Sequence, residues 1–406
     1  MKWFRPGKQK PALVGNQNGV ALLFAMVTII IVAYLASELS YETNVEYLVN
    51  AQELQRVKAY YAARAGMELS LLRIKIYGQV SSQLSGQAKG MVKQDMIDMI
   101  WKMPFAWPPV LPTSTDVDKD LLKEKIDASA MDAGYTTTIS DEGTKLNLND
   151  LNSPAQTVRD ITKKQLVAIF KNKIRDDEEW ARNHQDLRPD ELVNSIQDWV
   201  SFGRVSANGG DKASRYSSLG EGYPPNRAFR TVDEMRLVPG MTEDAFELLR
   251  DQVTVFGMGA INPNQASKDV LMALDPSITS KIADQIIERR TDNTKGGEFK
   301  DANDFWNYVS SIGARVDPNN QQNIPIICDS VFNFKIVATG AYKNTTSEIT
   351  AIVFDLQKTA GQTIKMIQTA AAAGAGQPPP SQPAPGANPN NSASKGPPRI
   401  VYWNER

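Results

Sequence analysis

The chain of 406 residues has little of the chemistry that most enzymes use. It contains one cysteine, Cys328, and one histidine, His184. A single cysteine excludes an internal disulfide and a cysteine-rich metal site, and a single histidine excludes zinc and hydrolytic centres that need two or more histidines. We identify no set of base, nucleophile and glycine-rich phosphate loop. We therefore predict that the chain is not an enzyme and assign no catalytic residue.

The chain also lacks an excess of either charge. It has 45 basic and 46 acidic residues, a net charge of -1, so no global basic surface points to nucleic acid. With 41% apolar and 22% charged residues it has the composition of a globular protein, and its length allows roughly two to three domains. Charge is informative only near the N-terminus, which carries four basic residues and no acidic one: Lys2, Arg5, Lys8 and Lys10.

Residues 20–36 contain no charged side chain. This block of about seventeen residues is at the short end of what spans a membrane as a helix. By the positive-inside rule, the basic leader keeps the N-terminus in the cytoplasm and the rest of the chain is exported. A removable secretory signal is an alternative, but a cut after Ala36 would place Tyr34 where a small residue is preferred. A plain signal anchor for a periplasmic scaffold is a second alternative.

The helical pattern continues from the apolar block to about residue 77 without a proline. A helix of ~58 residues would extend ~87 Å, too long for a membrane span alone, so we expect one half in lipid and the other half against a globular head. An apolar stripe runs along the second half at steps of three and four residues, the pattern of a face that a helix buries. Its members are Val45, Leu48, Ala51, Leu54, Val57, Tyr61, Ala65, Leu69, Leu72 and Ile76.

Strand patterns occur in two widely separated places. Residues 133–143 read as a strand that Gly143 ends, and alternating apolar residues near 332–336 and 349–353 flank a turn over Gly340 to Thr346. Roughly two hundred residues of mainly helical pattern lie between these strands, which predicts a sheet split by an insertion.

About six short helices are expected in the insertion, and Thr231 with Glu234 fits a capping box at one helix start. Two similar N-x-N pieces precede predicted helices, and we interpret their asparagines as caps and turn formers. The four asparagines are Asn147, Asn149, Asn262 and Asn264.

The N-terminal segment NGVALLFAMVTIIIVAYLASELSYETNVEYLVNAQELQRVKAYYAARAGMELSL resembles the minor pseudopilins of the general secretion pathway protein K family of type II secretion. Further matching pieces follow in order, among them DEGTKLNLNDL, LVNSIQDWV and YPPNRAFRTVDEMRLVPGMT. The resemblance implies cleavage by prepilin peptidase after Gly19 and N-methylation of Val20. Most pseudopilins carry glutamate at the fifth mature position, where this chain has Phe24, and K-type members are similar in lacking that acid.

The fold that the resemblance implies is an α/β (α+β) pseudopilin fold, in which a long N-terminal transmembrane helix packs on a small antiparallel sheet and a large all-α domain is inserted between strands. The predicted domains are a leader at 1–19, the N-terminal helix at 20–77, the first part of the head at 78–140, the inserted helical domain at 141–329, closing strands at 330–357 and a disordered tail at 358–406.

The function that the resemblance implies is a minor pseudopilin that caps the pseudopilus tip with the I- and J-type minor pseudopilins and primes its assembly for protein export. Its other expected partners are the H-type minor pseudopilin, the major pseudopilin, prepilin peptidase and the inner-membrane secretion platform. We expect a single-pass protein of the inner membrane with a periplasmic head. Phe24 suits a tip subunit, because a carboxylate at that depth is costly without a neighbour's ammonium.

A calcium ion is implied only by the resemblance, because K-type members commonly have an acidic metal-binding loop after the DW motif. The matching stretch has three acids, Asp198, Asp211 and Glu221, with Ser201 and Gly203 where the family favours aspartate. Calcium prefers six to eight oxygen ligands, several from carboxylates. A solvated loop is the alternative interpretation, and no other cofactor is expected.

A membrane-anchored, pilus-associated DNA-binding module is the alternative function. Residues 236–249 and 261–290 resemble helix-hairpin-helix units, which bind phosphate through backbone amides. The second turn, LDPSIT, has no glycine, and the local basic residues Lys281, Arg289 and Arg290 lie beside several acids. This weak basicity argues against nucleic acid, because phosphate neutralisation dominates such affinity.

The C-terminal region departs from the resemblance. From about Gly361 the chain is rich in alanine, glycine and proline, a composition that cannot offset its ordering entropy. The final RIVYWNER is apolar again, and it is either a strand for a partner's sheet edge or simply a hydrophobic end.

Overall fold

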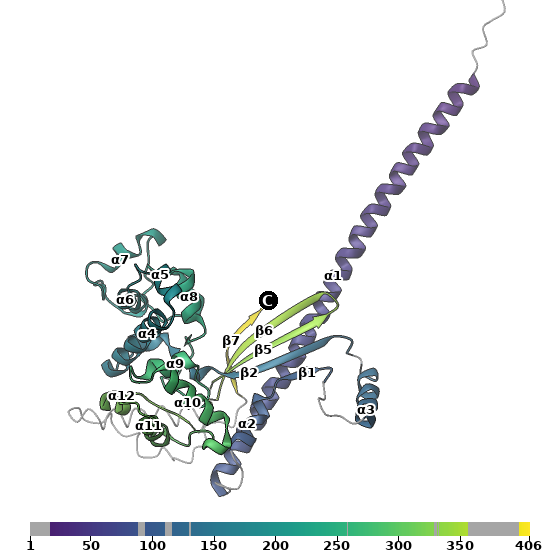
Figure 1. Cartoon of the computed structure of the whole chain (residues 1–406). Helices are drawn as coiled ribbons and strands as arrows, with labels where there is room; N and C mark the ends of the chain where they lie inside the picture. The colour runs from purple at the N-terminus through teal and green to yellow at the C-terminus, as the bar shows by residue number, and fades with distance from the viewer. Residues whose placement is uncertain are drawn as a thin grey trace, which may run out of the picture.

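The computed structural model describes residues 17–87, 94–109, 116–129, 131–257, 259–328, 331, 333–355 and 398–406. A single long helix, α1 (Gln17–Gln87), runs along an antiparallel sheet, and a mostly helical body lies at the end of the sheet where β2 ends and β5 begins (Figure 1). The predicted pseudopilin architecture is confirmed, although the insertion also contains one short parallel pair, β3 (Leu146–Asn147) with β4 (Val253–Thr254).

The sheet has five strands in the order β1-β2-β5-β6-β7, and each neighbouring pair is antiparallel. Because β2 ends at Asp141 and β5 begins at Asn333, the intervening chain leaves the sheet and returns to it. The closing hairpin is tighter than predicted, since Tyr342 pairs with Thr345. The strands are β1 (Phe105–Trp107), β2 (Gly134–Asp141), β5 (Asn333–Tyr342), β6 (Thr345–Phe354) and β7 (Arg399–Glu405).

The sheet packs on a face of α1 that is made of small residues. Ala59 and Ala63 are fully buried, and a Cβ at Gly340 of β5 would overlap the Ala59 carbonyl oxygen and the Ala63 amide nitrogen. Gly66 lies equally close to β2, because a Cβ there would be 2.7 Å from Thr137 Cγ2. Small side chains on both elements let the two backbones approach closely.

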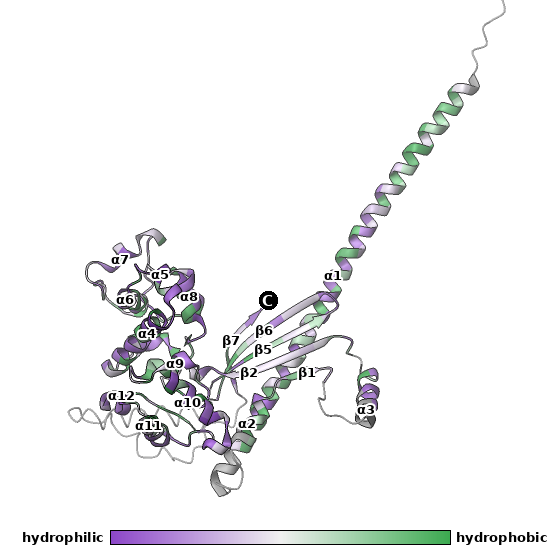
Figure 2. Cartoon of the chain, viewed as in Figure 1, coloured by the Kyte–Doolittle hydropathy of each residue, from purple (hydrophilic) through white to green (hydrophobic). Residues whose placement is uncertain are grey.

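The predicted apolar stripe of α1 is not the buried face. Leu54, Tyr61 and Leu72 have 56%, 60% and 50% of their surface exposed, whereas Met67 on the packed face is fully buried. Hydrophobic periodicity finds the larger apolar side chains, but the close approach of a strand requires small ones. Figure 2 shows that apolar residues continue along the part of α1 that projects beyond the sheet.

A second core organises the inserted body, separate from the core between α1 and the sheet. Trp199 is fully buried in this core and stacks on Phe229 with ring centroids 5.4 Å apart. Its α-helices are α4 (Gln156–Asp176), α5 (Glu178–Asn183), α6 (Pro189–Val200), α7 (Lys212–Arg215), α8 (Glu243–Arg250), α9 (Lys268–Leu274), α10 (Ser280–Thr291), α11 (Ala302–Ser311) and α12 (Pro318–Asn323). Two further helices, α2 (Gln94–Lys102) and α3 (Asp116–Asp127), belong to the first part of the head.

The two N-x-N pieces build similar arrangements in the two halves of the insertion. Asn149 donates to the Phe229 carbonyl at 3.2 Å and accepts from the Phe229 amide at 2.8 Å. Asn264 does the same with Phe299, at 2.9 and 2.8 Å. Each asparagine side chain thus pairs with a distant backbone segment as a neighbouring strand would. The spacing of the asparagines alone did not predict this role.

The structural interpretation of the asparagines is confirmed for Asn147, whose side chain caps the 3₁₀ turn that begins at Leu148. The predicted capping box is wrong. Thr231 precedes a 3₁₀ helix but makes no side-chain cap bond, and the Glu234 carboxylate accepts from Arg227 instead. The Glu234 carboxylate thus pairs with Arg227 rather than with the start of the helix.

The end of the predicted disordered tail is a strand. Residues 356–397 lie outside the described residues, but β7 pairs with β6 of the same sheet, and Arg406 and Glu348 exchange two backbone hydrogen bonds of 2.9 Å. Tyr402 also contacts Phe256 of the insertion, with ring centroids 5.5 Å apart. The final segment, interpreted as a strand for a partner's sheet edge or as a hydrophobic end, therefore pairs with the sheet of its own chain, because tethering gives the nearest edge a high effective concentration.

Candidate functional site

The residues predicted for N-terminal processing lie at the exposed start of α1. Gly19 has no atom near its Cα that would contact an added Cβ, and Val20 and Phe24 are 57% and 65% exposed. The helix from Gly19 to Ser81 contains an apolar window of mean hydropathy 2.6 that no part of the described chain covers. By length and composition it suits a single membrane anchor, and cleavage after Gly19 stays a prediction.

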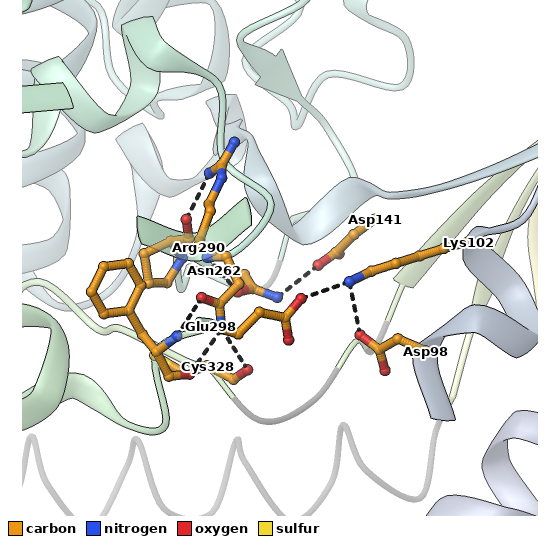
Figure 3. Close-up of polar contacts among 10 residues, drawn as sticks. Asp98, Lys102, Asp141, Asn262, Arg290, Glu298 and Cys328 are labelled. Atoms are coloured by element: carbon orange, nitrogen blue, oxygen red, sulfur yellow. Dashed lines mark hydrogen bonds and ion pairs between the residues drawn. The ribbon is translucent and has the colours of Figure 1, made fainter. Parts of the chain in front are cut away.

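The joint between the head and the insertion is polar. Lys102 at the end of α2 donates to Glu298 of the insertion at 2.8 Å and lies 3.2 Å from Asp98, one turn earlier in α2 (Figure 3). Burial alone would lower the pKa of Lys102, but the hydrogen bond to Glu298 and the charge of Asp98 raise it. One ammonium therefore links two acids that come from opposite sides of the joint.

Asp141, the last residue of β2, forms the second contact of this joint. Its carboxylate accepts from the Gly143 amide at 2.8 Å and from Asn262 Nδ2 at 3.1 Å (Figure 3). Burial raises the pKa of Asp141 to about 7, against the effect of these two hydrogen bonds, and the charges of Glu142 and Asp98 raise it further. Burial in the joint therefore favours the protonated form of this carboxyl.

Asn333, the first residue of β5, completes the joint at the point where the chain returns to the sheet. Its side chain is buried and donates to the Phe256 carbonyl at 2.7 Å. Both crossings between head and insertion are thus fixed by directional hydrogen bonds. Such bonds define the orientation of the inserted body more strictly than apolar contact alone does.

The three candidate calcium ligands do not converge. Asp198 is buried and accepts from the Ser206 hydroxyl and from the Ala207 amide at 2.8 Å, and Asp211 caps α7 by accepting from the Ser214 amide at 3.0 Å. Glu221 is exposed on a separate turn. In the described part of the chain no three acidic, histidine or cysteine side chains are grouped to hold a metal. These residues do not fit the calcium site that the resemblance implies.

A buried lysine occupies the same loop. Lys212 is only 2% exposed, and its Nζ donates to the Ser201 carbonyl at 2.8 Å, to the Ser201 hydroxyl at 3.0 Å and to Asn226 Oδ1 at 3.0 Å. Burial lowers the pKa of Lys212, and the negative charge of Asp198 opposes that shift. Lys212 and Ser201 are 11 residues apart, and no helix or strand pattern connects them along the chain, so the sequence did not predict this contact.

Two of the three basic residues considered in the helix-hairpin-helix pieces bind groups within the insertion. Arg289 binds both Asp304 oxygens, at 2.7 and 2.9 Å, and Arg290 donates to the Pro263 and Ala266 carbonyls. Lys281 is exposed on α10. Two of the three cations considered for phosphate binding are thus held inside the protein, so the structure does not favour the DNA-binding alternative.

The long apolar helix, the antiparallel sheet and the inserted body together define a pseudopilin with an enlarged head. Two family models, both described as type II secretion system, protein K, match residues 144–258 and 261–324. The chain belongs to the type II secretion system protein K family and is a minor pseudopilin. The border between the two matched regions falls between the two asparagine-centred halves of the insertion.

A chain of one solved structure shares the fold. It belongs to "The Crystal Structure of the GspK-GspI-GspJ complex from enterotoxigenic Escherichia coli Type 2 Secretion System", with a TM-score of 0.51 and 17% identity over 75% of this chain and 93% of that chain. The comparison with curated proteins gave no match.

Sequence reasoning missed the residues of the joint. Asp98, Lys102 and Glu298 are ordinary charged residues in sequence, and only folding brings α2 against the loop that precedes α11. Asn262 is the exception, because its N-x-N motif marked it as structural. Comparing the two N-x-N segments with each other as an internal repeat would have indicated the similar arrangement in the two halves of the insertion.

Proposed function

We propose that this minor pseudopilin caps the tip of the pseudopilus together with I- and J-type minor pseudopilins, above an H-type subunit, and primes assembly for protein export. One observation carries the proposal. The insertion leaves the sheet where Phe334 packs on Tyr77, whereas the β5–β6 hairpin at the opposite end lies beside Lys58, closer to the apolar segment (Figure 1). The added volume is therefore on the membrane-distal side, where the next subunit of a filament would stack.

Phe24 supports the same position in the filament. In a bundle of lipid-embedded helices, a carboxylate at this depth is costly unless a neighbouring subunit supplies a cation. A terminal subunit has no neighbour above it, and an apolar side chain at the fifth mature position avoids that cost. Phe24 presents 65% of its surface to the surroundings, as a lipid-facing residue would.

Membrane topology follows from the basic leader and the apolar block. We propose that prepilin peptidase of the inner membrane cleaves after Gly19, that Val20 becomes the methylated N-terminus, and that the head is periplasmic. Mass spectrometry of the protein from cells with and without prepilin peptidase tests this. Methylated Val20 is expected only with the peptidase, and an N-terminus at Met1 in both cells would contradict the proposal.

The exposed stripe of α1 is the surface that we assign to partner helices. Leu54, Tyr61 and Leu72 lie along it and are at least half exposed, while the opposite face holds the head. We expect partner helices to pack on this stripe, because burial of apolar side chains stabilises association by roughly 25 cal/mol per Å². No reaction is assigned to this surface.

Co-purification of the full-length chain with I- and J-type minor pseudopilins in detergent tests the tip assignment. We expect a stable complex with wild type and a reduced yield for the Leu54→Ala, Tyr61→Ala, Leu72→Ala triple variant. A matched variant that changes polar exposed positions of the same helix, Glu68→Ala with Lys75→Ala, should retain the complex. Recovery of the chain with the major pseudopilin on both sides of it, as an interior filament subunit, would contradict the cap.

A further inference from the structure

The loop of residues 201–226 begins directly after α6 and includes α7. Its backbone adopts left-handed conformations at Gly203, Gly209 and Gly210, with φ of 131°, 85° and 78°. Glycines at these positions increase the freedom of the unfolded loop, so its folded form needs strong internal contacts. The loop folds back on itself through bonds such as the Lys212 amide to the Arg204 carbonyl, at 2.8 Å.

The oxygens that face the interior of this loop form a set that suits a cation. They comprise a backbone carbonyl and a hydroxyl of Ser201 at the start of the loop and the side-chain carbonyl of Asn226 at its end. Asn226 is itself in a left-handed conformation, with φ of 49°. Asp198 adds a buried negative charge nearby. Carbonyl, hydroxyl and carboxylate oxygens are the ligands that calcium prefers.

Lys212 Nζ donates a hydrogen bond to each of these three oxygens. An ammonium group has three donors and no acceptor, so its contacts at 2.8, 3.0 and 3.0 Å use its full capacity. The lysine thereby ties the two ends of the loop together, as a metal with ligands from both ends would. Both oxygens of Asp198 are already occupied by Ser206 and Ala207.

We infer that the Lys212 ammonium replaces a bound calcium ion and makes the loop over residues 201–226 independent of metal. A divalent cation beside a buried ammonium would meet like-charge repulsion that is strong at the low dielectric of the interior. Carboxylates are also few here, because Ser201 and Gly203 stand where the resemblance favours aspartate. The Lys212 ammonium thus supplies at these oxygens the positive charge that a bound ion would otherwise bring.

The first experiment uses the unmodified full-length protein in detergent micelles. After dialysis against EDTA, calcium chloride is added, and hydrogen exchange of the amides of residues 201–226 is measured with and without it. We expect the same exchange rates in both conditions. Slower exchange of this loop on addition of calcium would overturn the inference, and this outcome requires no variant that has to fold.

The second experiment removes the ammonium. Lys212→Met keeps the length of the side chain but leaves the Ser201 and Asn226 oxygens without a donor, and we expect exchange of this loop to be about tenfold to a hundredfold faster. The matched control is Lys281→Met, which removes a lysine exposed on α10. Equal exchange in the two variants would overturn the inference.

Discussion

The head of this pseudopilin has two joints of opposite character. Its joint with α1 is apolar and close, formed by Ala59, Ala63 and Gly340, whereas its joint with the insertion is polar, formed by Lys102 with Glu298 and by Asp141 with Asn262. An apolar joint depends on shape and stays constant over pH and salt. A polar joint fixes orientation, and its strength depends on the charge state of its members.

The largest effect is expected from the apolar joint. Met67→Ala removes a fully buried side chain from the α1–sheet core and should lower the free energy of unfolding of the head by about 3–4 kcal/mol, because it leaves a cavity. Leu72→Ala on the exposed stripe of the same helix should change it by less than about 0.5 kcal/mol. Hydrogen exchange of β5 and β6 amides measures both, and similar losses would show that the head has no preferred face of α1.

Gly340→Ala is the next strongest test of the apolar joint. A Cβ at this position would overlap the backbone of α1, which cannot rotate away, so we expect a loss of about 3 kcal/mol. Gly78→Ala is the control, since its Cβ would be 3.7 Å from Asp355 Oδ2, an ordinary contact. Exchange of the β5 amides should rise for Gly340→Ala only, and a variant as stable as wild type would contradict the close packing.

Asp141 should make the polar joint sensitive to pH. Its folded pKa of about 7 exceeds the ordinary aspartate value of 3.8, so the folded protein binds more protons between these pH values and its stability falls as pH rises. We expect the free energy of unfolding to fall by about 2 kcal/mol from pH 5 to pH 7. The fall should be smaller in Asp141→Asn, which has no carboxyl at this position. Part of the slope should remain, because burial also raises the pKa of Asp150 to about 6.

Chemical denaturation over this pH range measures the slope for each variant. Asp251→Asn, which changes an exposed acid, is the control and should keep the wild-type slope. A slope that is identical in Asp141→Asn and wild type would remove Asp141 from the pH response.

The smallest effect is expected at the ion pair of the joint. Glu298→Gln keeps the shape of the side chain and leaves Lys102 with Asp98, so we expect a loss of about 1 kcal/mol that shrinks with added salt. The exposed pair of Lys295 and Glu288 offers a control, because Glu288→Gln should cost less than about 0.5 kcal/mol. Denaturation at low and high salt compares the two, and equal effects would mean that the joint gains nothing from burial of the pair.

Much of the fold was predictable, because its signals are local. The uncharged block at 20–36, the long proline-free helix and the strands on both sides of a helical insertion all follow from hydrophobic periodicity. The N-x-N motifs also marked structural asparagines correctly. Their partners were not predictable, because Asn149 and Phe229 are separated by 80 residues and meet only through folding.

The sequence by itself determined the long apolar helix that suits a membrane anchor and the split sheet, since both depend on the order and spacing of residues along the chain, and its motifs carry the resemblance to the protein K family. Only the tertiary structure decided which face of α1 carries the head, where β7 pairs and which oxygens Lys212 binds. These outcomes depend on how closely two backbones approach and on which groups are left to pair after burial. Such quantities exist only between segments that are distant in sequence.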